Sequence, residues 1–283
     1  TAPAARITVA HTQYKSTTQV LDGSITDGTP QNYTKFTVTP KSLGGGSTQV
    51  WTINNTGHLQ KPPVTINGSA SDAWKTLKAA IATADDGDVF IINGEVKATN
   101  ATDNSGELEV NKDITVKKAD GASTAVLNAN KDGTDVPSTK HRIFKVTSGK
   151  TLTLQDLTLK GGKPDASNEN GYGGGILLQG GTLDMKNCDV KGNESESGGG
   201  IYAGKVGTAA ASVTISGGTI GGMDAADKNK TGSYNSGGGI YIGNGCSLTM
   251  KDNAKVTGNE TGVSGGGIFA DASSTLFFDH CTV

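Results

Sequence analysis

The side chains that most often perform catalysis are few in this sequence and lie far apart. The sequence has four histidines, His11, His58, His141 and His280. It has two arginines, Arg6 and Arg142. No serine lies in a nucleophile-elbow motif. Hydrolysis of a glycosidic bond needs two carboxylates that reach one bond, and acids occur singly among threonines in the regular part of the chain. We therefore assign no catalytic residue and expect a protein that is not an enzyme.

Metal and cofactor sites are equally poorly supported. The stretch "NANKDGTD", which starts at Asn128, follows the first half of an EF-hand loop, but Thr139 stands where the bidentate glutamate belongs. We interpret it as a polar loop. Three cysteines, Cys188, Cys246 and Cys281, match no zinc spacing and are an odd number for a disulfide framework. No metal and no cofactor is implied.

Composition limits the partners and the kind of core. A net charge of -2 gives no strong field for nucleic acid, and no apolar run reaches the ~20 residues of a transmembrane helix. Glycine is abundant at 42 residues and aromatics make up 5%. Such a chain favours a thin core that is repeated many times.

An internal repeat supplies that core. Copies begin at Glu107, Thr151, Thr182, Ser212, Ser247 and Thr275, at intervals of 28 to 44 residues. Each copy reads as two short strands, because apolar and polar residues alternate with period 2. Equivalent inward positions of the first strand are Leu152, Leu183, Val213, Leu248 and Leu276.

A glycine run opens a third strand in four copies. "GGGI" occurs before Ile176, Ile201, Ile240 and Ile268. Glycine accepts positive φ without steric cost, so we expect Gly200 to form a corner with positive φ before Ile201. Three strands per copy predict an all-β chain that folds as a right-handed parallel β-helix, with coils stacked at ~4.8 Å. Cys188 and Cys281 are then buried, reduced thiols three coils apart.

The segments before the repeat read differently. Residues 71–85 are expected to form a helix that caps the first coil, with Trp74, Leu77, Ile81 and Ala84 on its buried face. Residues 1–65 are expected to form a small β-rich region, with strands in "ARITVAH", "TKFTVTP" and "TQVWTI" and a linker in "GHLQKPPV". The β-helix spans residues 66–283, and we expect it to continue beyond Val283.

The repeats resemble those of polymorphic outer membrane proteins, the chlamydial-type autotransporter passengers. "VKGNESESGGGIYAG" and "VTGNETGVSGGGIFAD" are similar to the F-x-x-N and G-G-A-[ILV] motifs of that family, with Asn193 and Asn259 at the asparagine. Valine stands where the family has phenylalanine, and glycine where it has alanine. The resemblance covers about residues 140–283 and implies a β-helix displayed on a bacterial surface as an adhesin. The capping segment also looks like the opening of pectin-lyase-like β-helices.

One outward row could bind a partner. It lies one residue after each core isoleucine and consists of Leu177, Tyr202, Tyr241 and Phe269, with Lys145 one coil earlier. Outward ladders on a β-helix often stack on themselves and stabilise the rod, whereas rows of exposed aromatics suit protein or sugar partners. Both interpretations stay open.

Three functions follow as hypotheses. The first is a secreted or cell-surface bacterial protein, extracellular or at the outer membrane, that adheres to a host or cell-surface protein or glycan. The second is a carbohydrate-active β-helix enzyme, either a polysaccharide lyase or a glycoside hydrolase. The third is a structural stalk that displays the N-terminal region. A screen for degradation of sugar polymers separates the second from the others.

Overall fold

A computed structural model describes residues 62–165 and 171–283 in full and, before residue 62, several strands. The chain divides into two units, Thr1–Pro63 and Val64–Val283. Antiparallel pairs connect the strands of the first unit, which are β1 (Arg6–His11), β2 (Tyr14–Val20), β3 (Phe36–Val38), β4 (Gln49–Ile53) and β5 (Leu59–Gln60). Three of these match the expected strands. The short β5 lies inside the segment that we expected to be a linker.

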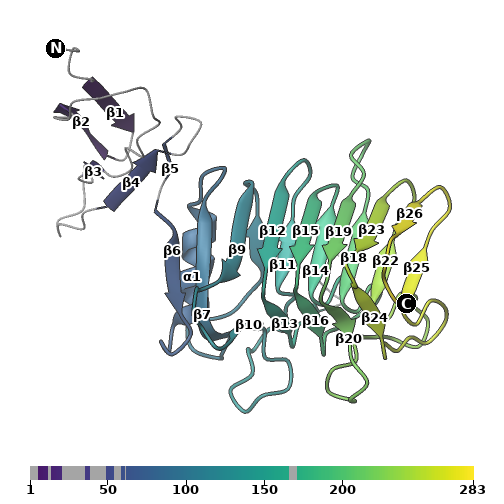
Figure 1. The fold of residues 1–283 in the computed structure, drawn as a ribbon. Helices are drawn as coiled ribbons and strands as arrows, with labels where there is room; N and C mark the ends of the chain where they lie inside the picture. Colours follow the sequence, from purple (N-terminus) through teal and green to yellow (C-terminus); the bar gives the residue numbers. More distant parts are fainter. Residues whose placement is uncertain are drawn as a thin grey trace. The chain divides into compact units, whose positions relative to one another are not determined.

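The second unit is a parallel β-helix (Figure 1). A 13-stranded sheet divides at β7 (Val89–Lys97) into two arms, which we call the first and second sheets, and a separate six-stranded sheet is the third. The first sheet contains β6 (Val64–Asn67), β7 (Val89–Lys97), β9 (Ile114–Lys118), β12 (Thr151–Gln155), β15 (Thr182–Lys186), β19 (Ser212–Ser216), β23 (Ser247–Lys251) and β26 (Thr275–Phe278). The second sheet contains the end of β7, then β10 (Ala125–Asn128), β13 (Thr158–Lys160), β16 (Asp189–Lys191), β20 (Thr219–Gly221) and β24 (Lys255–Thr257). The third contains β8 (Leu108–Val110), β11 (Phe144–Val146), β14 (Ile176–Gln179), β18 (Ile201–Gly204), β22 (Ile240–Ile242) and β25 (Ile268–Ala270). A short extra pair joins β17 (Glu194–Ser195) to β21 (Lys230–Thr231).

The predicted register of the coils is confirmed. Leu152, Leu183, Val213 and Leu248 are partners on successive strands of the first sheet. Ile176, Ile201, Ile240 and Ile268 are partners on the third. These inward side chains are almost all inaccessible to solvent and form one continuous core, because period-2 alternation places every second residue of a strand inside the coil.

The glycine corners work differently from the prediction. Positive φ occurs at the first glycine of each run, Gly173, Gly198, Gly237 and Gly265, with φ between 63° and 72°, and not at Gly200. The third glycine is required by close approach instead, since a Cβ on Gly200 would lie 2.7 Å from the carbonyl oxygen of Gly239 in the next coil. The runs before Ile176, Ile201 and Ile240 therefore need glycine for two separate reasons, one of conformation and one of space.

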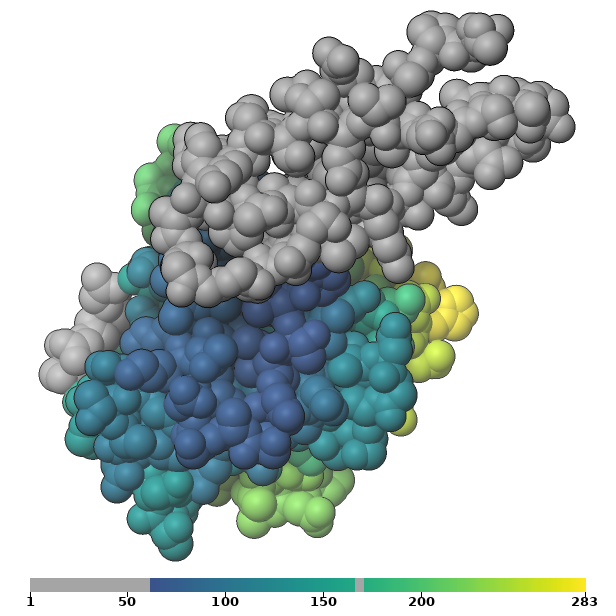
Figure 2. All heavy atoms as spheres, turned by 90° about the vertical axis from the view of Figure 1, so that its left-hand side faces the viewer, coloured from purple at the N-terminus to yellow at the C-terminus, as the bar shows by residue number. Residues whose placement is uncertain are grey.

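The capping helix is confirmed as α1 (Ala73–Ala82), and the four residues predicted for its inner face are buried. Asp72 stands at the N-cap without a side-chain hydrogen bond to the helix. Asn104, from the loop after β7, supplies that bond instead and accepts from the backbone N–H of Lys75 at 2.9 Å. The indole of Trp74 donates to the carbonyl of Gly106 at 2.8 Å. Figure 2 views this end of the unit, where the dark-blue atoms belong to the cap and the first coil.

The cysteines are free, as predicted. Cys188 and Cys246 are buried, but the prediction that Cys281 is buried is wrong, because this residue, which follows β26, is only half-buried. Desolvation raises the pKa of Cys188 to about 12, so its thiol stays protonated and acts as a small apolar core residue.

Candidate functional site

The outward aromatic row forms a continuous stack on the third sheet. Tyr202 and Tyr241 have ring centroids 4.8 Å apart and an interplanar angle of 14°, and Tyr241 and Phe269 are 5.0 Å apart at 26°. Tyr172, which the sequence analysis did not include, extends the stack beyond Tyr202 at 4.6 Å and 17°. The parallel register sets the spacing of Tyr202, Tyr241 and Phe269, because equivalent side chains of neighbouring coils lie directly above one another.

Two features of this row bear on its use as a binding surface. Leu177 has an exposed fraction of only 3%, so this member of the predicted set is covered and cannot be part of an exposed stripe. The inner rings turn their faces to one another, which leaves their edges for solvent. The hydroxyl of Tyr241 donates to Asp271 at 3.2 Å. This geometry suits a ladder that stiffens the rod, since the π-faces that hold a sugar ring are already in use.

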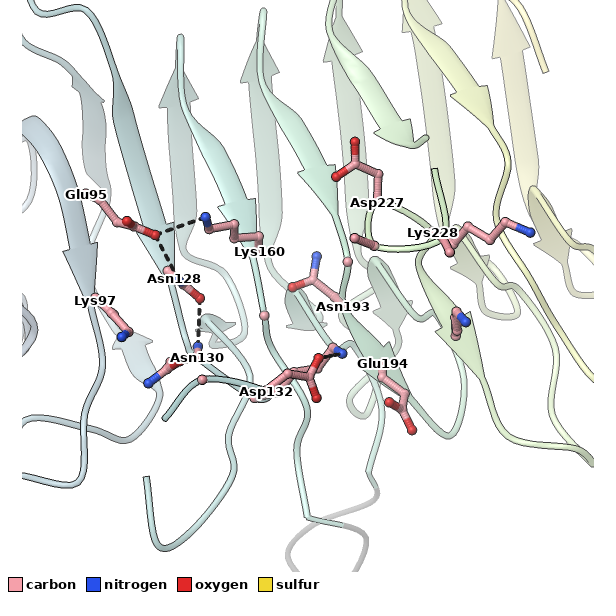
Figure 3. Close-up of a pocket in the computed structure, with 17 residues that line it drawn as sticks. Glu95, Lys97, Asn128, Asn130, Asp132, Lys160, Asn193, Glu194, Asp227 and Lys228 are labelled. Atoms are coloured by element: carbon pink, nitrogen blue, oxygen red, sulfur yellow. Dashed lines mark hydrogen bonds and ion pairs between the residues drawn. The ribbon is translucent and has the colours of Figure 1, made fainter. Parts of the chain in front are cut away.

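A polar groove runs along the second sheet at the ends of its strands (Figure 3). It has a volume of about 590 Å³. Two loops that project from the coils form its walls, one after β10 and one after β20 (Figure 1). The first loop contributes Lys131, Asp132 and Gly133, and the second contributes residues 225–228. The groove therefore crosses several successive coils.

Among the described residues, the lining of this groove contains no aromatic or large apolar side chain. Its residues are charged, amide-bearing or very small: Glu95, Lys97, Asn128, Asn130, Lys131, Asp132, Gly133, Lys160, Gly161, Gly192, Asn193, Glu194, Ala225, Ala226, Asp227, Lys228 and Lys230. Such a surface recognises a ligand through hydrogen bonds and charge rather than through apolar burial.

Ion pairs hold the charged side chains of the groove. Lys160 lies 3.0 Å from Glu95, and Lys191 lies 3.0 Å from Asp227. Other pairs join Lys97 to Asp135 at 2.6 Å, Lys163 to Glu194 at 2.5 Å, and Lys131 to Asp132. All of these partners are partly exposed, so each pair contributes little to stability and can exchange its partner for a ligand group at low cost.

The ion pairs also fix the protonation state of the carboxyl groups. Desolvation acts to raise the pKa of Glu95, but hydrogen bonds from Lys160 and Asn128 outweigh it, so the net pKa is lowered. A hydrogen bond from Lys97 lowers the pKa of Asp135. Both groups are therefore carboxylates that accept hydrogen bonds at neutral pH.

A buried asparagine ladder lies beneath the groove. The Nδ2 atom of Asn193 donates to Oδ1 of Asn229 at 3.0 Å, and Nδ2 of Asn229 donates to Oδ1 of Asn259 at 3.0 Å. Asn193 and Asn229 are fully buried, and their amides also bond carbonyls of the second sheet such as Val190. Asn193 and Asn259 were found from the motif. Asn229 was missed because the loop of residues 222–228 separates it from β20.

The comparisons with known proteins add no assignment: no family model, no curated protein and no solved structure matches the chain. In the described part of the chain, no helix has the length and apolar character needed to cross a membrane. Within residues 62–165 and 171–283, no three His, Cys, Asp or Glu side chains are grouped so as to hold a metal ion.

The groove residues were missed by the sequence analysis, although two signals pointed to them. Lys160 and Lys191 are register partners at the last position of their strands, and the repeat alignment places both before a glycine. Long connections from second-sheet to third-sheet strands, after β10 and after β20, supply the walls. Paired carboxylates and rows of aromatic residues are the usual sequence signs of a site, and this groove is built from lysines and amides instead.

Proposed function

We propose that this chain is the binding rod of a secreted or cell-surface bacterial protein, and that its groove holds a linear glycan during adhesion. The supporting observation is the polar groove that crosses several coils between two projecting loops. A parallel β-helix repeats its hydrogen-bonding groups at ~4.8 Å along the axis, which suits a ligand that itself repeats along a line. The resemblance of the repeats to autotransporter passengers is consistent with this proposal.

The chemistry of the lining favours a glycan over a protein partner. Protein interfaces draw their energy from aromatic and apolar anchors in desolvated pockets, and the groove has none. Hydroxyl groups both donate and accept, so a sugar can donate to Glu95 or Asp227 and accept from Lys160 or Asn128.

The charge of the groove favours a glycan of low net charge. Its lining has five lysines, Lys97, Lys131, Lys160, Lys228 and Lys230, against four carboxylates, Glu95, Asp132, Glu194 and Asp227. The difference is one positive charge. A strongly anionic polymer would meet these carboxylates as well as the lysines, so its attraction to the groove would be weak.

An enzymatic role in the groove has less support. A general acid for glycoside cleavage needs a raised pKa, whereas the pKa of Glu95 is lowered. A sugar-polymer degradation screen tests this alternative, and robust cleavage would replace the binding proposal.

A blocking substitution tests the proposal directly. Ala226 lines the groove and is exposed, so Ala226→Trp should fill it, whereas Ala210→Trp places the same side chain on an exposed turn outside the groove. Both variants and the unchanged chain are applied to an immobilised glycan array. We expect saturable binding to neutral linear glycans that Ala226→Trp weakens at least about tenfold, equivalent to 1.4 kcal/mol. Equal binding by all three proteins would overturn the assignment of the groove.

A further inference from the structure

A second, smaller pocket lies beside the third sheet, where β8 and β11 begin. It has a volume of about 380 Å³ and is separate from the glycan groove. Two of its lining residues, Arg142 and His141, are almost fully buried, with exposed fractions of 3% and 8%. They are the most buried of the lining residues that the structure describes.

The guanidinium of Arg142 is only partly satisfied by the protein. Its Nη1 lies 2.5 Å from the Glu107 carboxylate, and its Nε donates to the carbonyl of Tyr172 at 3.2 Å. Its Nη2 is buried and has no hydrogen-bond partner among the residues that the structure describes. A buried donor without a partner carries a desolvation cost that a bound acceptor would remove.

The neighbouring His141 offers the complementary group. Its Nδ1 lies 2.7 Å from the backbone carbonyl of Arg142. A carbonyl can only accept, so Nδ1 carries the proton and Nε2 is a lone-pair acceptor. This Nε2 is also buried and, within residues 62–165 and 171–283, without a partner. Desolvation lowers the pKa of His141 to about 4, so the imidazole stays neutral at physiological pH.

The charge of the pocket matches a single anionic group. Among the lining residues that the structure describes, Lys140, Arg142 and Lys145 supply three positive charges, and Glu107 and Asp165 supply two negative charges, which leaves a difference of one. Lys145 also lies 3.9 Å from Glu107, so this carboxylate pairs with both Arg142 and Lys145. A monoanion restores neutrality, whereas a dianion would leave an excess of negative charge.

From these groups we propose that the pocket binds a small hydroxycarboxylate. The carboxylate accepts a charge-assisted hydrogen bond from Nη2 of Arg142, and the neighbouring hydroxyl donates to Nε2 of His141. A ligand of this class carries both an acceptor for Nη2 of Arg142 and a donor for Nε2 of His141.

Calorimetric titration of the full chain with lactate, acetate and inorganic phosphate tests this proposal. Acetate has the carboxylate without the hydroxyl, so we expect lactate to bind at least about fivefold more tightly than acetate. Trp74 gives a second readout by fluorescence, because its ring centroid lies 5.3 Å from that of His141. No saturable heat with lactate would overturn the proposal, and phosphate binding more tightly than lactate would reassign the pocket to phosphate.

Two variants test separately the contact of Arg142 with the carboxylate and the contact of His141 with the hydroxyl. Arg142→Lys keeps the charge but loses the planar donor fork, and should weaken lactate and acetate alike by about tenfold. His141→Phe removes the acceptor, and should make lactate and acetate bind equally. If circular dichroism shows that Arg142→Lys is unfolded, Lys140→Ala replaces it, since Lys140 is exposed at the pocket, and should weaken both anions about threefold. Unchanged preference for lactate in His141→Phe would contradict the hydroxyl contact.

Discussion

At the scale of single residues, the glycine runs show that one residue type serves two physical needs. Gly198 has positive φ, and a Cβ there would also lie 2.4 Å from the carbonyl oxygen of Ile201. Gly200 has an ordinary backbone, but its Cβ position is occupied by the carbonyl of Gly239. The corner is thus a place where one coil rests directly on the backbone of the next.

Substitution of Gly200 should therefore be costly even without strain in φ. We expect Gly200→Val to lower the free energy of unfolding by about 3 kcal/mol through overpacking, and Lys205→Ala, on an exposed turn, to change it by less than about 0.5 kcal/mol. Urea denaturation gives both values. Equal midpoints for the two variants would mean that the corner has room for a side chain.

Asn187 illustrates a turn residue whose backbone matters more than its amide. It has a φ of 51°, and its amide donates to Asp156 at 3.3 Å on the exposed surface. We expect Asn187→Ala to cost about 1 kcal/mol, because alanine is strained in the left-handed region. Asn187→Gly should cost less than Asn187→Ala, since glycine adopts this conformation freely. Identical denaturation midpoints for the two variants would argue against a strained turn.

At the scale of elements, the sequence predicted most of what periodicity controls. Inward and outward positions, the register of Leu177, Tyr202, Tyr241 and Phe269, and the helix α1 all follow from local alternation and spacing. The sequence could not predict the contacts that loops make with elements far from them along the chain. Asn104 bonds the helix from 29 residues away, and the walls of the groove come from two insertions of different length.

The asparagine ladder joins three coils, so its loss should affect more than one of them. Asn229 donates to Val190 at 2.7 Å and accepts from Asn193 at 3.0 Å. We expect Asn229→Ala to lower the free energy of unfolding by about 2 kcal/mol, because buried polar groups lose their partners. The exposed Asn244 is the matched control, and Asn244→Ala should change the free energy by less than about 0.5 kcal/mol. A similar small change in Asn229→Ala would show that water replaces the ladder.

Ionisation of a tyrosine in the aromatic ladder should lower the free energy of unfolding at alkaline pH. Desolvation, together with Tyr241 and Tyr172, raises the pKa of Tyr202 to about 12, against about 10 in an unfolded chain. The folded state thus holds this proton more tightly, so its contribution to stability is complete below pH 10 and is lost as the pH rises toward 12.

Comparison with a residue that cannot ionise isolates this effect. Tyr202→Phe keeps the ring in the stack but has no proton to lose, so its stability should fall less than that of the unchanged chain between pH 10 and 12. Denaturant midpoints measured across this range give the difference. Parallel pH profiles for the two proteins would contradict a shifted pKa at Tyr202.

At the scale of the whole second unit, the repeat of the coil aligns equivalent residues of successive coils, so that they form long continuous surfaces. The third sheet carries an aromatic stack whose ring faces are used internally. The second sheet carries the open groove, where ion pairs on partly exposed side chains can be exchanged for a ligand. We therefore assign rigidity to the third sheet and ligand binding to the second sheet.

Hydrogen–deuterium exchange in the presence of a glycan that the array identifies tests this central claim most directly. The account predicts slower exchange in the loop of residues 129–135, in the loop of residues 222–228, and at the ends of β10, β13 and β16, with no change in β18, β22 or β25. Protection confined to the third sheet around Tyr202 and Tyr241, or no protection in either loop, would contradict the assignment of the groove as the binding surface.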